Sequence, residues 1–85
     1  MQRFIEIGEK STDGSFRLVW EDGYEIHSAI QGDEIIIKAN RQGLRTLASH
    51  LMALAEEDVS SGYHIHLDDL NSLEDGSYGI VLERI

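Results

Sequence analysis

The spacing of apolar residues changes along the chain from a strand-like to a helix-like period, and this limits the fold to a single helix among strands. From Leu44 onward, apolar side chains fall at positions 44, 47, 48, 51, 54 and 55, as on one face of an α-helix. Asn40 precedes them and is a good N-cap residue. We therefore predict a helix at about 41–57 that turns these apolar positions toward the core.

Short segments of alternating or β-branched apolar residues flank this helix on both sides. Turn dipeptides such as Asp13-Gly14 and Gly32-Asp33 separate the segments that precede it. The predicted strands are residues 3–8, 15–20, 24–30 and 34–39 before the helix and residues 63–68 and 78–85 after it.

The resulting order, β-β-β-β-α-β-β, predicts the fold class. Strand 34–39 enters the helix almost without a loop, and a short connection leads from the helix to strand 63–68. Such a crossover makes these two strands parallel, whereas tight turns make the other neighbours antiparallel. We expect one α+β domain over residues 1–85, with a mixed, mainly antiparallel sheet of about six strands and the helix on one face.

The charge of the chain excludes several classes of partner. Seven Lys and Arg against sixteen Asp and Glu give a net charge of −9, whereas proteins that bind nucleic acids or anionic membranes need basic surface. Cys is absent, which excludes disulfides and thiolate metal sites. The sequence has no apolar run of about 18 residues, so we expect no membrane span, and we expect no secretory signal at residues 1–10 because they lack an apolar segment. We expect a cytoplasmic protein without nucleic-acid or membrane binding.

One acidic cluster lies where the physics of the helix disfavours it. Glu56, Glu57 and Asp58 fall at the helix C-terminus, where the macrodipole disfavours each anion by about 0.3–1 kcal/mol and where Lys or Arg is expected. Asp68 and Asp69 should lie at the opposite pole of the sheet. Local conflicts of this kind tend to mark functional surface, so these acids predict a positively charged macromolecular partner. Solvated turns are the alternative explanation for the acidic groups.

A histidine motif in strand 63–68 allows two interpretations. His64, His66 and Asp68 share one face of the strand. They are either interface residues or, with Asp68 as third ligand and His27 as fourth, a metal site. We expect neither an enzyme nor a cofactor, because one small sheet with one helix offers little room for a catalytic pocket.

Several predicted strands are apolar on both faces, although a single helix can cover only one face of the sheet. In strand 34–39, for example, Ile36 points opposite to Ile35 and Ile37. A second copy of the chain could bury the open face or an edge strand. A homodimeric structural domain without catalytic activity is therefore a further alternative.

Four local patterns occur together between residues 39 and 82. They are an Asn-x-x-Gly-Leu helix start at 40–44, a Leu-Ala-rich helix, a His-x-His-Leu-Asp strand at 64–68, and a Gly-Ser turn at 76–77 before an apolar last strand. In these patterns the chain resembles a family of small bacterial immunity proteins from polymorphic toxin systems. The resemblance implies a non-enzymatic protein that binds and blocks a cognate toxin, often a nuclease with a basic substrate groove.

An acidic inhibitor would complement such a groove by charge. We therefore predict a toxin-binding surface that combines the helix-end acids, the two histidines and the acidic pair after them. The predicted residues are Glu56, Glu57, Asp58, His64, His66, Asp68 and Asp69.

Overall fold

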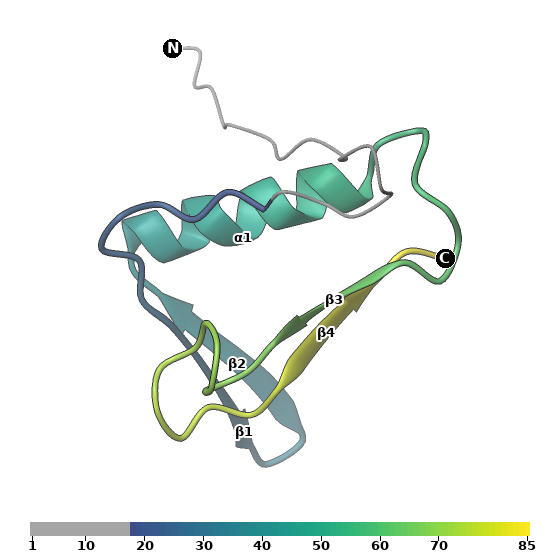
Figure 1. Ribbon diagram of the computed structural model, residues 1–85. Helices are drawn as coiled ribbons and strands as arrows, with labels where there is room; N and C mark the ends of the chain where they lie inside the picture. Colours follow the sequence, from purple (N-terminus) through teal and green to yellow (C-terminus); the bar gives the residue numbers. More distant parts are fainter. Residues whose placement is uncertain (1–17) are drawn as a thin grey trace, which may run out of the picture.

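The computed structural model describes residues 18–85 as a helix above two β-ribbons (Figure 1). The elements are β1 (Ile26–Gln31), β2 (Glu34–Ala39), α1 (Arg41–Leu54), β3 (His64–Leu67) and β4 (Ile80–Glu83). β1 pairs with β2 and β3 with β4, in both cases antiparallel. The α+β class and the predicted position of strand 34–39 are confirmed.

The β1–β2 ribbon is a tight hairpin that extends away from the core. Gly32 occupies its first turn position with φ +63, a backbone conformation that few other residues adopt without strain. At the open end of the hairpin Ile26 is fully buried, whereas Ile30 and Ile35, paired beside the turn, are exposed. One face of the hairpin therefore passes from the core into solvent.

The prediction of a single six-stranded sheet is wrong. Predicted strand 3–8 lies outside the described residues, and residues 18–20 have no regular structure. The two strands expected to run parallel, β2 and β3, belong to different sheets.

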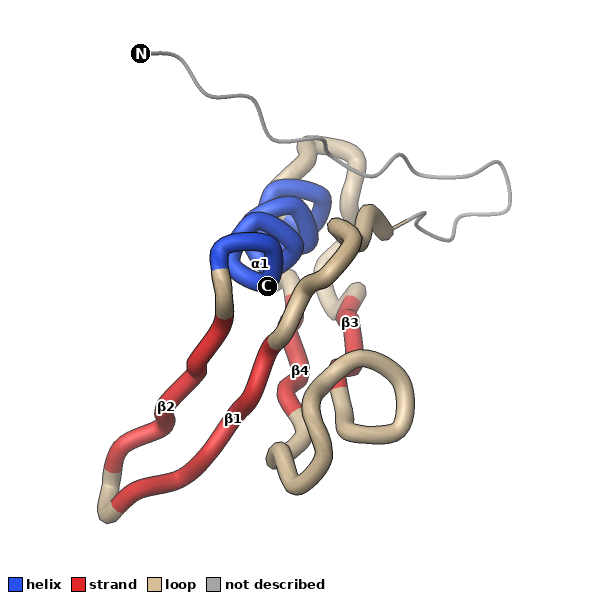
Figure 2. The backbone as a smooth tube through the Cα atoms, turned by 90° about the vertical axis from the view of Figure 1, so that its left-hand side faces the viewer, coloured by secondary structure: helices blue, strands red, loops and turns tan. Residues whose placement is uncertain are grey.

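A loop occupies the place that a further strand would take beside β1. The carbonyl oxygen of Ile26 accepts a hydrogen bond from the N–H of Glu74 at 2.9 Å, and that of Ser28 accepts from Tyr78 at 3.2 Å. The Ser77 hydroxyl accepts from the N–H of Ser28 at 3.2 Å. Because these bonds satisfy the outer edge of β1, the two ribbons remain separate (Figure 2).

Asn40 fixes the start of α1, as the sequence predicts. Its side-chain oxygen accepts from the N–H of Gly43 at 2.7 Å and from that of Glu25 at 2.9 Å. Its amide group donates to the carbonyl oxygen of Gly23 at 2.9 Å. One side chain thus caps the helix and ties it to the segment that leads into β1.

The helix buries a different face from the one predicted. Of the predicted apolar stripe, Leu54 is buried and Leu47 packs against the core. Leu44 and Leu51, however, are exposed. The buried positions of α1 are Gly43, Thr46, Ser49, His50, Ala53 and Leu54. The reason lies at the first turn, where a Cβ atom on Gly43 would overlap the backbone carbonyl of Glu25. This close approach, together with the hydrogen bonds of the Asn40 side chain, sets the rotation of the helix about its axis.

The core lies between the helix and the bases of the two ribbons. It is formed by Ile26, Leu54, Ile65, Leu67 and Leu73. The helix ends at Leu54, with Ala55 as its C-cap, three residues before the predicted end at about 57. The acidic residues that follow therefore leave the helix and enter an exposed turn.

Candidate functional site

Three segments that are distant in sequence meet at the C-terminal end of α1. The side chain of Arg84 donates from Nη1 to the carbonyl oxygens of Leu54, at 2.7 Å, and of Glu56, at 2.9 Å. Its backbone N–H donates to Tyr63 at 2.8 Å, and its carbonyl oxygen accepts from Gly62 at 2.7 Å. The end of the helix, the start of β3 and the end of β4 are therefore held together.

The predicted helix-end acids are exposed at this junction. Glu56, Glu57 and Asp58 occupy the turn after the helix, and the exposed Glu83 adds a fourth carboxylate from β4. Within residues 18–85, no ion pair is formed by Glu56, Glu57 or Glu83. Arg84 is the cation at this end among residues 18–85, and its guanidinium group donates to the carbonyl oxygens of Leu54 and Glu56.

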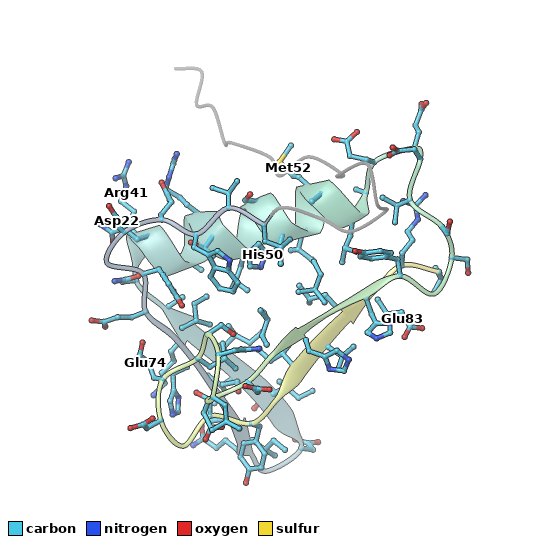
Figure 3. All side chains as sticks on the ribbon, viewed as in Figure 1. Asp22, Arg41, His50, Met52, Glu74 and Glu83 are labelled. Carbon is cyan, nitrogen blue, oxygen red and sulfur yellow. The ribbon has the colours of Figure 1, made fainter. Side chains whose placement is uncertain are left out.

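The other cations of the described chain lie elsewhere. Lys38 is at the end of β2, and Arg41 and Arg45 belong to the first turns of α1. Arg45 Nε forms an ion pair with a carboxylate oxygen of Glu21 at 2.8 Å. Figure 3 shows Arg41 at the start of α1 and Glu83 on the opposite side of the molecule, beside the β3–β4 ribbon. Among the described residues, charge is thus segregated along α1, and Glu56, Glu57 and Glu83 form no ion pair at its C-terminal end.

The two histidines of β3 extend this surface along the second ribbon. His64 lies opposite Glu83 and His66 lies opposite Val81 in the strand register. Both histidines are exposed, with ring centroids 4.8 Å apart in an edge-to-face arrangement. His64 Nδ1 lies 2.9 Å from the carbonyl oxygen of Gly62, which fixes this ring near the junction.

An apolar groove of about 390 Å³ separates the end of α1 from β4. Leu51 and Val81 are both about half exposed, and Ile85 is 98% exposed. The groove is lined by Leu51, Leu54, Ala55, Val81, Leu82, Glu83, Arg84 and Ile85. An apolar centre with a charged margin is the usual anatomy of a protein–protein interface. We call the groove, the acids 56–58 and Glu83, and the two histidines the helix-end surface.

Asp68 and Asp69 do not join the helix-end surface. They follow the far end of β3, and Asp68 organises the turn there. Its carboxylate accepts from the N–H of Leu70 at 2.9 Å and from that of Asn71 at 3.1 Å. Its carbonyl oxygen accepts from Leu73 at 2.8 Å. Asp68 therefore acts as a turn-forming residue, while Asp69 is exposed.

The four candidate ligands of the alternative metal site are not brought together in one place. His27 belongs to β1, whereas His64 and His66 belong to β3 in the other ribbon. In the part of the chain that the structure describes, no group of three or more His, Asp or Glu side chains is arranged to hold a metal ion.

Sequence reasoning missed the role of Arg84 and the apolar groove. A signal for Arg84 exists, because it is the single basic residue among residues 46–85. Leu51 was predicted to face the core and instead lines the groove. Its exposure depends on the rotation of the helix, which the Gly43 contact sets.

Comparison with known proteins gives one family. Residues 34–85 match the family model of immunity protein 32. The matched segment begins at β2 and includes α1, β3 and β4, and with them the whole helix-end surface. No curated protein and no solved structure matches the chain. Within residues 18–85, no helix has the length and hydrophobicity needed to cross a bilayer.

Proposed function

The chain belongs to the immunity protein 32 family, and from this premise we propose that it is a non-enzymatic inhibitor that binds and neutralises a cognate toxin. Family membership over residues 34–85 is the observation that carries the proposal. The exposed acids and the apolar groove in this segment supply the chemistry for docking to a protein.

We propose the helix-end surface as the docking site. The carboxylates of Glu56, Glu57 and Glu83 would face Lys and Arg side chains of the toxin. An apolar toxin side chain would fill the groove between Leu51 and Val81. Buried apolar anchors usually dominate the binding energy of such interfaces, whereas charges at the margin mainly increase the association rate. His64 and His66 would contact the toxin at one side of this groove.

Electrostatics favours a toxin that acts on nucleic acid. A nuclease needs a positively charged groove for its phosphate backbone, and an acidic inhibitor is complementary to that groove. The described residues carry thirteen acidic and four basic side chains, so attraction would begin well before contact. Occupation of the basic groove would exclude the nucleic acid. Asp68 and Asp69 would contribute to this long-range field without contacting the toxin at the groove.

Co-purification tests this function. The probe would be the C-terminal domain of the protein whose gene lies immediately upstream of this one, prepared with an inactivating substitution and an affinity tag. We expect the untagged full chain to be retained at low salt and the association rate to fall at about 0.5 M NaCl, where screening is strong. We also expect co-expression to restore growth of cells that carry the active toxin. Absence of both capture and growth rescue would contradict the proposal.

A further inference from the structure

The outer edge of β2 presents free hydrogen-bonding groups. In β1, Ile26 and Ser28 direct their backbone groups away from β2, toward Glu74 and Tyr78. In an antiparallel pair, two directly opposed residues either both point their N–H and C=O groups toward the partner strand or both point them away from it. Ile37 lies opposite Ser28 in the register. The N–H and C=O groups of Ile37, and of Ile35 two residues before it, therefore point outward.

Nothing in residues 18–85 covers this edge. No described residue outside the hairpin forms a hydrogen bond to Ile35 or Ile37, and their side chains are 78% and 46% exposed. Natural proteins usually protect such edges with bulges, prolines or covering loops, because an open apolar strand pairs readily with another chain. The corresponding edge of β1 has such a cover in the loop that contains Glu74 and Tyr78.

We propose that β2 pairs antiparallel with β2 of a second copy of this chain, around a twofold axis at Ile36. In this register Ile35 of each copy lies opposite Ile37 of the other. Each of these two pairs can exchange both of its N–H···O bonds. The result is a four-stranded sheet in the order β1-β2-β2-β1 that crosses the dimer.

The charges of β2 favour a second copy in this one register. The strand begins with the sequence Glu34-Ile-Ile-Ile-Lys38, and both charged side chains are exposed. With the axis at Ile36, Glu34 of each copy faces Lys38 of the other, and opposite charges directly across a ladder are favourable. An axis at Ile37 would instead place Glu34 opposite Asn40. The segment is therefore complementary in charge to itself only in the proposed pairing.

The proposed dimer leaves the helix-end surface open. β2 is the outer strand of its ribbon and lies away from β3 and β4 (Figure 2). The groove residues come from the end of α1 and from β4, not from the hairpin. A dimer would thus carry two helix-end surfaces. The dimer is independent of the proposed toxin binding, since it requires no other protein.

A charge exchange tests the register. Sedimentation velocity of the full chain over a range of concentrations should show a dimer of 9.6 kDa protomers. Lys38→Glu places two acids opposite each other at both ends of the pair, and Glu34→Lys does the same with two bases. We expect each single variant to raise the dissociation constant at least about tenfold, and the double variant E34K/K38E to return it to within about threefold of the wild type.

A proline substitution tests the edge itself. Ile37→Pro removes an N–H that points away from β1, so the hairpin keeps its own hydrogen bonds. We expect a monomer whose circular dichroism spectrum and urea midpoint remain close to those of the wild type. If Ile37→Pro unfolds the chain, Ile35→Lys provides the same test through its exposed side chain. A monomeric wild type, or a dimer that these substitutions and the charge exchange leave unchanged, would overturn the proposal.

Discussion

Arg84 donates from Nη1 to the carbonyl oxygens of Leu54 and Glu56, at 2.7 Å and 2.9 Å, so the residue that follows β4 supplies the cation that the last turn of the helix lacks. Positive charge and hydrogen-bond donors both stabilise unpaired carbonyl groups at a helix C-terminus. This contact also explains how Glu56 and Glu57 are tolerated beside the negative end of the helix dipole. Stability and surface charge at this end therefore depend on one side chain.

Replacement of Arg84 should destabilise the fold. For Arg84→Met we expect a loss of about 1–3 kcal/mol in the free energy of unfolding, because charged hydrogen bonds to the helix end are removed. Arg84→Lys keeps the charge and should lose less. Urea denaturation of both variants measures the difference. An unchanged midpoint in Arg84→Met would mean that the contact adds no net stability.

Gly43 should tolerate no side chain. A methyl group there would overlap the carbonyl group of Glu25 and approach Ile26 Cγ1 to 3.0 Å. Although alanine normally favours helices over glycine by about 1 kcal/mol, we expect Gly43→Ala to lower the free energy of unfolding by about 2–4 kcal/mol through overpacking.

Gly79→Ala is a matched control for this substitution. A Cβ atom at Gly79 meets the carbonyl oxygen of Leu67 at 3.8 Å, an ordinary contact, and Gly79 has no positive φ. Thermal or urea unfolding should therefore separate the two variants clearly. Equal stability would contradict the close helix–strand approach.

Asn40 should contribute more to stability than an ordinary N-cap. Its oxygen accepts from both Gly43 and Glu25, while its amide donates to Gly23. We expect Asn40→Ala to cost about 2–3 kcal/mol, against about 1 kcal/mol for a typical cap. Asn40→Asp keeps the acceptors and loses the donor, so its unfolding midpoint should be intermediate. An Asp variant as unstable as the Ala variant would show that the link to Gly23 dominates.

Local signals predicted the elements better than their arrangement. The helix start follows from Asn40 and the following apolar period, both of which act within a few residues. The sheet arrangement instead depends on hydrogen bonds between Ile26 and Glu74 and between Ser28 and Tyr78, about fifty residues apart in sequence. No hydrophobic period encodes these bonds, because they involve a loop.

In the candidate site, too, the features that depend on neighbouring residues could be predicted, whereas those that depend on tertiary contacts could not. The proximity of the acids 56–58 to His64 follows from the chain connectivity, since they all belong to the connection of residues 55–63 or to the first residue of β3. The groove requires the helix rotation set by Gly43 and the return of β4 to Leu54 through Arg84. Both are tertiary contacts, which explains why the sequence indicated the charges of the surface but not its apolar centre.

Charge reversal at the helix-end surface should weaken toxin binding more than the same change elsewhere. Glu56→Lys alters an exposed carboxylate beside the groove, while Asp22→Lys makes the same change near the other end of α1, close to Arg41 (Figure 3). For Glu56→Lys we expect an association rate reduced about tenfold at low salt. Asp22→Lys should have a much smaller effect, because its site is distant from the groove. Surface plasmon resonance with the inactivated toxin domain measures both, and equal losses would argue against this docking site.

His50 should make the fold less stable as the pH falls. Its side chain is fully buried, neither ring nitrogen has a hydrogen-bond partner among residues 18–85, and the Trp20 ring packs against it with the ring centroids 4.4 Å apart. Burial lowers the pKa of His50 below its ordinary value of 6.5. The polar backbone of Val19 favours the charged imidazole and offsets part of this lowering. Between the lowered pKa and 6.5 the unfolded chain therefore binds more protons than the folded chain.

Stability must then rise with pH through this window. The contribution of neutral His50 is complete above pH 6.5 and is lost as the pH falls from 6.5 toward the folded-state pKa. We expect His50→Leu to reduce the loss of stability between about pH 7.5 and about pH 5.5, measured by urea unfolding at both values. A steeper loss in His50→Leu than in the wild type would show that the buried imidazole is protonated in the folded chain.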